Sequence, residues 1–423
     1  MKTGVLVTVS FGLGIGLGCL AMALLGSPEG PGRTRESDRG PSPAAPTHSP
    51  AQASVRAAPV RSLPESSRDR AEALRDLQET PDRSRVPELL AALDAEKDAG
   101  LRVLACAALG ECGDASILGD LLRRFRSESD FRVRYALLEA ALRIGGPEVD
   151  ALCRELVATP DDSRDGVLLG ELAAGGLVAR DTPEAAAFVE SFLKAGVLPM
   201  GHDPDWTSRS HLLEKLSERG DAKSLALLAA VAGDGSLSVD LRAAALRALG
   251  DTKTEGRAAA LASLLEAALA SGDPAIVEDV DPRMEAVSAL GARPEEPAAA
   301  KVLAGLLQGA RVLPEELRRQ SVRSLGNAGG PEDAALLLGI ARDPAVPPAT
   351  RKVALSSYGR VAGTAAVQAL EEIAMGAAPM EERTAAVRAI GMTPPGPKRS
   401  ALERIAAGSP DRRVAELARA YLR

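Results

Sequence analysis

The chain is 423 residues long, which suffices for two or three ordinary domains or for one elongated array of repeats. Alanine and leucine dominate its apolar content, and one tryptophan, three tyrosines and five phenylalanines supply too few large rings for a thick globular core. The net charge of −7 comes from interspersed acids and bases, so no single-sign field is present to attract nucleic acid or another polyanion.

Residues 4–26 form a run without a charged side chain, preceded only by Lys2 and the amino terminus. The run is long enough to cross a bilayer as a helix, so we expect residues 1–26 to be a transmembrane anchor or a signal peptide. An uncleaved anchor ranks first, cleavage after the small-x-small sequence Ala-Met-Ala at 21–23 ranks second, and lipid attachment at Cys19 ranks third. Each outcome places the rest of the chain outside the cytoplasm, either tethered to the membrane or released as a secreted or periplasmic protein.

Residues 27–68 are rich in proline, serine and alanine and show no apolar periodicity. Such a segment buries too little surface to offset the entropy of ordering, so we expect a disordered linker. The folded domain is expected to occupy residues 69–423. Its first residues, 69–78, are predicted to form a capping helix, and the arginine-rich segment 411–423 is predicted to be a polar terminal cap.

Within the folded domain one ten-residue stretch recurs at intervals of about 35 residues, which is typical of helical repeat arrays. The stretch LRAAALRALG at 241–250 reappears with its arginine second and its glycine last. The copies are LRVLACAALG at 101–110, PRMEAVSALG at 282–291, LRRQSVRSLG at 317–326, TRKVALSSYG at 350–359 and ERTAAVRAIG at 382–391. Gly145 is interpreted as the end of another copy, and degenerate copies are expected to end near Gly175 and Gly220.

A second periodic segment precedes each of these stretches, as in VPELLAALD at 86–94 and DAALLLGIA at 333–341. Apolar residues recur at helical spacing, and no segment shows the sustained alternation of a strand. The sequence Gly-Gly-Pro-Glu at 145–148 and 329–332 ends one helix and starts the next. We therefore predict an all-α fold, an α-solenoid of about ten stacked antiparallel helix pairs.

An arginine stands eight residues before the final glycine of each stretch, near the start of the predicted second helix. A cation at this position opposes the helix dipole and needs acidic neighbours. The arginines are Arg102, Arg242, Arg283, Arg318, Arg351 and Arg383, and the acids that precede them are Asp98, Asp240, Asp281, Glu315 or Glu316, Asp343 and Glu381. We interpret the column as a structural ladder of ion pairs between neighbouring units, with a basic stripe that grips an acidic ligand as the alternative.

This pattern, an acid, then valine or leucine, then arginine and an ending of the form AAxALG, resembles the HEAT-like repeats of phycobilisome-lyase-type proteins. The resemblance covers roughly residues 83–423 and concerns the repeat class. It implies an α-solenoid that binds other proteins. Some lyases of that group attach bilins, but no catalytic residue is carried over to this chain, so a lyase-type enzyme that handles a cofactor stands only as an alternative.

One segment departs from the repeat, GVLPMGHDPDWTSRSH at 196–211. We interpret it as a long inter-helix loop whose tryptophan packs on the solenoid, in preference to a metal site built from its histidines and aspartates. Loops held on a rigid scaffold often carry recognition, and tryptophan is a frequent interface hot spot. The candidate partner-binding residues are His202, Asp203, Asp205, Trp206 and His211.

Other chemistry is not expected. The chain has no nucleophile elbow, phosphate loop or metalloprotease motif, so we expect no catalytic residue, no cofactor and no metal. Cys106 and Cys153 are expected to be small buried residues, while Cys112 is left open between a free thiol and a disulfide. The acidic run at 273–281 is interpreted as a solvated turn, because it lacks the spacing of a calcium-binding loop.

These observations favour a non-catalytic scaffold, exported and membrane-tethered, that binds protein or peptide partners on a solenoid surface. Contact with the membrane is expected only through the N-terminal segment. A lyase-type enzyme and a structural spacer of the cell envelope are the alternatives.

Overall fold

The computed structural model describes residues 63–64, 66–159, 161, 163–195, 205–270, 281–294 and 296–423. In these ranges all regular elements are helices. The predicted anchor or signal peptide at 1–26 and nearly all of the predicted linker at 27–68 lie outside the described residues. None of the helices described combines the length and the apolarity needed to cross a bilayer.

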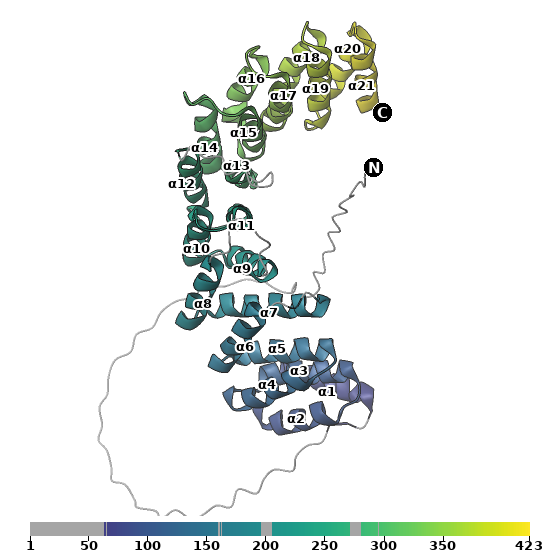
Figure 1. Ribbon diagram of the computed structural model, residues 1–423. Coiled ribbons are helices and arrows are strands. Elements are labelled where there is room, and N and C mark those ends of the chain that lie inside the picture. The colour runs from purple at the N-terminus through teal and green to yellow at the C-terminus, as the bar shows by residue number, and fades with distance from the viewer. Residues whose placement is uncertain are drawn as a thin grey trace, which may run out of the picture. The chain divides into compact units, whose positions relative to one another are not determined.

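In the described ranges, helix α1 (Ser67–Glu79) precedes ten hairpins, each with a first and a second helix (Figure 1). The first helices are α2 (Val86–Ala95), α4 (Leu118–Ser127), α6 (Pro147–Ala158), α8 (Pro183–Lys194), α10 (Ala222–Gly233), α12 (Arg257–Ala270), α14 (Pro297–Gln308), α16 (Ala334–Arg342), α18 (Val367–Met375) and α20 (Lys398–Gly408). The second helices are α3 (Ala99–Cys112), α5 (Phe131–Ile144), α7 (Arg164–Arg180), α9 (Trp206–Arg219), α11 (Val239–Asp251), α13 (Pro282–Leu290), α15 (Glu315–Ala328), α17 (Pro348–Ala362), α19 (Met380–Met392) and α21 (Arg412–Leu422). The all-helical repeat predicted from the sequence is confirmed for this part of the chain.

Local sequence signals set the helix ends. Asp98 accepts hydrogen bonds from the amides of Gly100 at 2.7 Å and Leu101 at 3.1 Å, which satisfies two free donors at the start of α3. Gly220 follows α9 with a φ of 56°, a left-handed conformation that glycine adopts without strain. At these two places the local sequence accounts for where the helix begins or ends.

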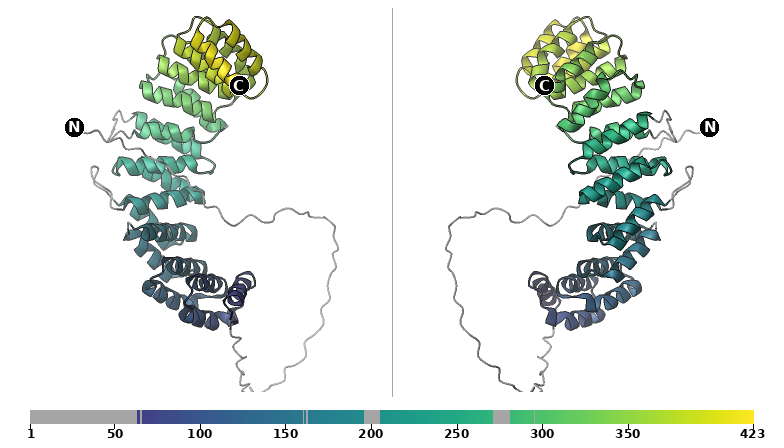
Figure 2. Two further views of the ribbon diagram at one scale, coloured as in Figure 1. Left: turned by 90° about the vertical axis from the view of Figure 1, so that its right-hand side faces the viewer. Right: turned by 90° about the vertical axis from the view of Figure 1, so that its left-hand side faces the viewer.

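Consecutive hairpins pack on one another in chain order (Figures 1 and 2). Each second helix packs on its own first helix and on the second helices before and after it. Leucine and alanine fill the layer between them, as shown by Leu109, Leu246 and Ala386, which are buried. Because small side chains let the helices approach closely, a core with few aromatic rings is sufficient.

The repeated glycines mark close approaches between second helices. A Cβ atom at Gly250 would lie 3.0 Å from Cα of Ala289 in the next second helix, and one at Gly326 would lie 2.9 Å from Cα of Ser357. Gly110, Gly359 and Gly391 lie in the same way against the next second helix. All five glycines lie inside helices, so they are contact positions and not helix ends.

Helix α5 breaks this column. Gly145, interpreted from the sequence as the end of a copy, is the C-cap of α5, with a φ of 72°. The residue that stands twelve positions after the N-cap of α5, as Gly110 does in α3, is Leu142. Its side chain lies directly over Gly176 of α7, and α5 and α7 approach each other less closely than the other consecutive second helices.

The three cysteines in the described part of the chain, Cys106, Cys112 and Cys153, are free and buried. Burial raises the pKa of Cys106 and of Cys153 to about 12, so these thiols are protonated at neutral pH and are poor nucleophiles. Cys112 lies 3.5 Å from the carbonyl oxygen of Leu77, and burial raises its pKa as well. The alternative of a Cys112 disulfide to either neighbour is thus not realised in this structure.

Candidate functional site

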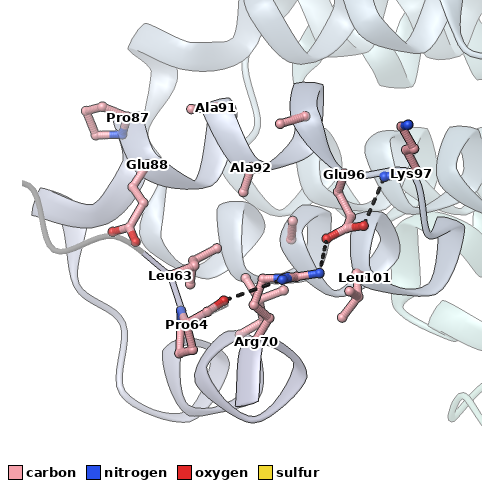
Figure 3. Close-up of a pocket in the computed structure, with 13 residues that line it drawn as sticks. Leu63, Pro64, Arg70, Pro87, Glu88, Ala91, Ala92, Glu96, Lys97 and Leu101 are labelled. Atoms are coloured by element: carbon pink, nitrogen blue, oxygen red, sulfur yellow. Dashed lines mark hydrogen bonds and ion pairs between the residues drawn. The ribbon is translucent and has the colours of Figure 1, made fainter. Parts of the chain in front are cut away.

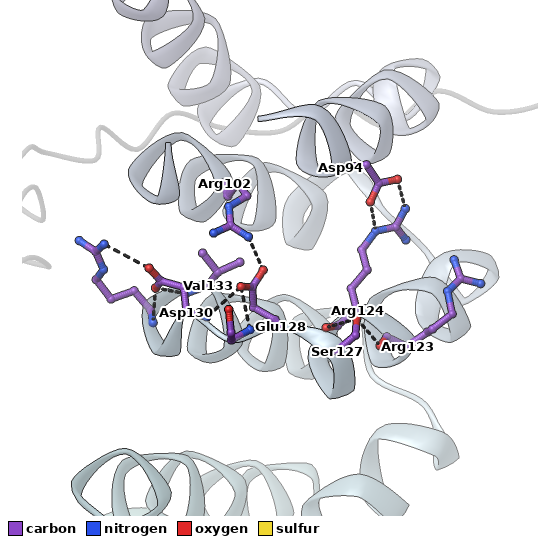
Figure 4. Close-up of polar contacts among 10 residues, drawn as sticks. Asp94, Arg102, Arg123, Arg124, Ser127, Glu128, Asp130 and Val133 are labelled. Carbon is purple, nitrogen blue, oxygen red and sulfur yellow. Dashed lines mark hydrogen bonds and ion pairs between the residues drawn. The ribbon is translucent and has the colours of Figure 1, made fainter. Parts of the chain in front are cut away.

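The predicted arginine column lies at the start of the second helices, but the acids that contact it differ from those expected. Asp98 caps its own helix, and Arg102 instead pairs with Glu128 of the next hairpin (Figure 4). Arg351 pairs with Glu382, and Arg383 lies 4.0 Å from Asp411, again in the next hairpin.

The remaining members of the column behave differently. Arg283 pairs at 2.8 Å with Asp281, the residue expected from the sequence. Arg242 donates to the carbonyl of Ala232 at 3.3 Å. Arg318 makes no ion pair within the described residues. The expected acids Glu381 and Glu316 pair with Lys352 and Arg319.

In some hairpins the end of the first helix explains why a cation is tolerated there. Arg209 donates to the carbonyl of Ala195 at 3.0 Å, and Arg383 donates to that of Ala374 at 2.8 Å. These carbonyls lie at the C-terminal ends of α8 and α18, where unpaired carbonyls and the negative end of the dipole favour a cation. These contacts fit the structural interpretation of the column at the positions where they occur, and the basic stripe stays the alternative.

The arginine column has further members, which become visible when positions are numbered from the N-cap of each second helix instead of from the repeated glycine. An arginine lies four residues after the N-cap in eight second-layer helices of the described chain, α1 included. They are Arg70, Arg102, Arg134, Arg209, Arg242, Arg318, Arg351 and Arg383. The missed members have other partners: the guanidinium of Arg134 lies 5.1 Å from the ring centroid of Phe125, and that of Arg209 lies 5.5 Å from that of Phe192.

The predicted partner-binding loop is only partly described. His202 and Asp203 fall in 196–204, outside the described residues. Asp205 is the N-cap of α9, yet its side chain makes no capping hydrogen bond and lies 3.8 Å from Arg209. Trp206 and His211 belong to α9 itself, so they are helical residues, and the indole packs on the core as expected.

A hollow of about 550 Å³ lies beside this helix, between α5, α7 and α9. We call it the α5–α7–α9 hollow. It is built from second helices only, and its lining residues are Tyr135, Glu171, Leu172, Gly175, Gly176, Val178, Ala179, Lys215, Glu218 and Arg219. It lies at the seam where Leu142 of α5 packs over Gly176 of α7, and Gly175 contributes no side chain to its lining.

The hollow combines an aromatic ring with a charged rim. Tyr135 is half-buried, and its ring centroid lies 6.0 Å from that of Phe131. Burial raises the pKa of Tyr135, and the nearby charges of Glu139 and Glu171 raise it further, so the phenol keeps its proton at neutral pH. Nζ of Lys215 lies 3.3 Å from Glu171 and 3.1 Å from Glu218.

The pKa values of Lys215 and His211 determine the charges on α9 at and near the hollow. Burial would lower the pKa of Lys215, but its hydrogen bond to Glu218 and the charges of Glu218 and Glu171 outweigh burial and raise it. Burial lowers the pKa of His211 despite Glu171 and Glu214 nearby, so its imidazole is neutral at pH 7. The hollow thus combines a carboxylate–ammonium–carboxylate array with the aromatic ring of Tyr135, which suits a protruding side chain of a partner.

The sequence reasoning missed this hollow, although one signal was present. Six of the nine aromatic residues lie between 125 and 206, a short part of an otherwise ring-poor chain. They are Phe125, Phe131, Tyr135, Phe188, Phe192 and Trp206. Because aromatic side chains are enriched at interfaces, this clustering pointed to α4–α9. No group of three metal-ligating side chains occurs among the residues that the structure describes.

Comparison with known proteins identifies the repeat. The family model of HEAT repeats matches residues 86–173, which span α2 to the middle of α7. No curated protein matches the chain.

The solved structures that match this chain share little sequence with it. Kap121p bound to Pho4p matches 85% of this chain and 44% of its own, with 13% identity and a TM-score of 0.44. Importin beta matches 81% of this chain and 51% of its own, with 17% identity and a TM-score of 0.36. Human deoxyhypusine hydroxylase in complex with glycerol matches 73% of this chain and 96% of its own, with 21% identity and a TM-score of 0.26. The chain therefore spans less than half the length of Kap121p and about half that of importin beta.

Proposed function

We propose, from the premise that this chain is a HEAT-repeat protein, that it is a non-catalytic scaffold which holds a protein partner against the α5–α7–α9 hollow. One observation carries the proposal: a hollow lies at the seam between α5 and α7, where these helices pack less closely than the other consecutive second helices of the described chain, and aromatic and charged side chains gather there. Repeat proteins use the surface left after neighbour stacking for binding.

The chemistry of the hollow supports a protein partner. Tyr135 offers apolar area and a phenolic donor at a low entropic cost, and the Glu171–Lys215 pair offers an acceptor and a donor beside it. An exposed rim around a desolvated aromatic centre is the arrangement in which interface hot spots occur. The predicted contact residues Trp206 and His211 lie on α9, which forms one wall.

Site-specific photo-crosslinking tests this function. A photo-reactive phenylalanine analogue replaces Tyr135 in the full chain in its native cells, and a matched variant carries it at Ala187, which is exposed on the first helix α8. We expect one specific protein adduct from position 135 and none from position 187. Equal adduct patterns from both positions, or no adduct from position 135, would contradict the proposal.

We further propose that the chain is exported and held at the membrane by its uncleaved first residues. This rests on the uncharged run at 4–26, which the structure does not describe. The intact mass of the mature protein tests it: we expect the mass of the full chain and release from membranes only by detergent. A mass that lacks residues 1–23 would overturn the anchor and leave a secreted or periplasmic protein.

The absence of catalysis is likewise a proposal. A lyase-type enzyme would hold a chromophore or a metal, so the absorbance spectrum and metal content of the purified full chain separate the two functions. We expect a colourless protein without stoichiometric metal. A bound chromophore at one per chain would contradict a purely non-catalytic scaffold.

A further inference from the structure

Closely packed second helices form one surface in the C-terminal part of the solenoid. Helices α15, α17 and α19 follow one another in the layer of second helices, and their repeated glycines are Gly326, Gly359 and Gly391 (Figure 1). The residues seven before, three before and one after each of these glycines are four apart, so they share one side of the helix. All nine of these residues are exposed or partly exposed. We call this surface the α15–α17–α19 face.

The α15–α17–α19 face is basic. Five of its nine residues are cations and the other four are neutral. The cations are Arg319, Arg323, Lys352, Arg360 and Arg388. The matching positions of α3, α5 and α9, counted in α5 and α9 from the residue twelve after the N-cap, hold one arginine and four acids. These residues are Arg143, Glu111, Glu139, Glu214 and Glu218. The charge of the second-helix layer therefore changes sign along the chain.

Two of the five cations are neutralised at the edge of the face. Arg319 pairs with Glu316 of its own helix. Lys352 pairs at 2.6 Å with Glu381 of the next second helix. Both acids stand ten residues before the repeated glycine, outside the three positions that define the face.

The other three cations have no acidic partner within the described residues. Arg323 donates to the amide oxygen of Gln320 at 2.8 Å, and Arg360 donates to that of Asn327. Arg388 is exposed and makes no hydrogen bond or ion pair in the described part of the chain. Each of three consecutive second helices thus presents one arginine whose charge is not neutralised.

Cations at the matching positions of earlier second helices face an acid. From α3 to α13 they are Arg143, which pairs with Glu111, and Arg247, which lies 3.8 Å from Glu285. The arginine beside the pocket of about 730 Å³ between α1, α2 and α3 is also paired, because Arg70 lies 3.1 Å from Glu96 (Figure 3). The arginines of the α15–α17–α19 face differ from these.

We propose that the α15–α17–α19 face binds an extended acidic segment of a partner protein. Packed helices lie about 8–10 Å apart, and an extended chain advances about 3.3 Å per residue. A segment that crosses the three helices with a carboxylate at every third residue therefore meets one arginine on each helix. A guanidinium can hold a carboxylate through two parallel hydrogen bonds, which orients the segment as well as attracting it.

The composition of the face favours an acidic protein segment over a nucleic acid. None of its nine residues is aromatic, so it offers no ring on which bases could stack. Glu316 and Glu381 at its edge repel a continuous phosphate backbone. Met392 belongs to the face and is 82% exposed, so it offers an apolar contact to a side chain of a peptide.

Fluorescence anisotropy with the full chain tests the proposal. The probe is a labelled synthetic peptide with glutamate at every third position and glycine and serine between, and its control carries glutamine in place of glutamate. We expect the glutamate peptide to bind at least about tenfold more tightly than the control peptide at low salt, and to lose affinity as salt is added.

Variants of the chain locate the binding. Arg323→Gln with Arg388→Gln is expected to raise the dissociation constant of the glutamate peptide at least about fivefold. Arg323→Lys with Arg388→Lys keeps both charges and is expected to retain most of the affinity. The matched control, Arg123→Gln with Arg399→Gln, removes the same charge from exposed arginines of the first helices α4 and α20 and is expected to change it less than about twofold. Unchanged thermal unfolding shows that the variants are folded.

Three outcomes would overturn the proposal. The first is equal binding of the glutamate and glutamine peptides, or binding of neither. The second is an equal loss of affinity in the first-helix control variant. The third is tighter binding of a single-stranded oligonucleotide with the same number of charges, which would identify nucleic acid as the ligand class. The face lies on helices other than those of the α5–α7–α9 hollow, so none of these results depends on whether a partner binds there.

Discussion

The stretch from α15 to α19 and the stretch from α5 to α9 are built from the same type of helix hairpin. They differ at the position where a second helix contacts the next second helix. In α15 and α17 the contact position is a glycine, and the next second helix lies directly on it. In α5 the same position is Leu142, and a hollow opens beside it. The place where a large side chain replaces glycine in α5 is thus also the place where the candidate binding surface lies.

The ion pairs of the two regions differ in their exposure to solvent. The Arg351–Glu382 pair bridges α17 and α19 with side chains that are 12% and 7% exposed. The Lys215–Glu171 pair beside the hollow is 20% and 38% exposed. Because the Arg351–Glu382 pair is buried, breaking it is costly. The Lys215–Glu171 pair is more exposed, so it contributes little to stability and is available to a partner.

The largest expected effect comes from the buried pair. Arg351→Ala leaves the carboxylate of Glu382 buried without its cation, so the free energy of unfolding is expected to fall by about 3 kcal/mol. Lys215→Ala is the matched change at the hollow and is expected to cost less than about 1 kcal/mol. Urea unfolding of the two variants measures the difference. Equal losses would show that the two regions do not differ in this way.

The next effect tests the glycine column. Gly326→Ala places a Cβ 2.9 Å from the backbone of Ser357, so α15 and α17 must move apart, at a cost of about 2 kcal/mol. Gly339→Ala in α16 is the control, because nothing lies within 4 Å of its Cβ. The control is expected to gain stability. Thermal unfolding checks both, and a stable Gly326→Ala variant would remove the steric basis of the comparison.

A smaller effect concerns acid stability at the start of α10. Burial disfavours the charge of Asp221, but hydrogen bonds from the Ser224 amide and Arg219 outweigh burial and hold its pKa at about 2. The unfolded value is about 3.9, so this carboxylate contributes stability above about pH 4 that is lost as the pH falls toward 2.

Asp221→Asn keeps a capping side chain and removes the charge. It is expected to lower the unfolding free energy at pH 7 by about 1 kcal/mol and to flatten its dependence on pH between about 4 and 2. Denaturant titrations at a series of pH values measure this. An unchanged pH profile would show that Asp221 is not stabilised as a carboxylate in the folded chain.

The smallest expected effect is a gain in stability, from a substitution at the hollow. A Cβ at Gly175 meets only the Lys215 side chain, 3.7 Å away, so Gly175→Ala is expected to raise the unfolding free energy by about 0.5 kcal/mol through helix propensity. Calorimetry of this variant beside Gly326→Ala gives the two signs directly. Destabilisation at position 175 would mean that the hollow is closed in solution.

The repeat class was predictable because its signals are local. The ten-residue stretch, the helical spacing and caps such as Asp98 lie within one hairpin, so the sequence reports them without knowledge of the packing. The position of α5 within the repeat was harder to predict. Gly145 was interpreted as a member of the glycine series, but it is a helix end, and only the N-cap at Asp130 shows that Leu142 holds the equivalent position.

The candidate site was not predictable in the same way. Tyr135, Glu171 and Lys215 are separated by long stretches of chain and meet only because three second helices pack side by side. The partners of Arg102 and Arg351 were missed for the same reason, since they lie one hairpin further along. Of the predicted loop residues, Trp206 and His211 lie on α9, which also contributes Lys215 to the hollow, while His202 and Asp203 are outside the described residues.

Binding of the crosslinked partner to variants of α7 tests the central claim most directly. Gly175→Leu fills the α5–α7–α9 hollow, whereas Gly170→Leu adds the same side chain to the same helix at a position with nothing within 4 Å of its Cβ. The account predicts that the dissociation constant, measured by calorimetry, rises at least about tenfold for Gly175→Leu and stays unchanged for Gly170→Leu. Equal affinity of both variants and the unmodified chain would contradict it.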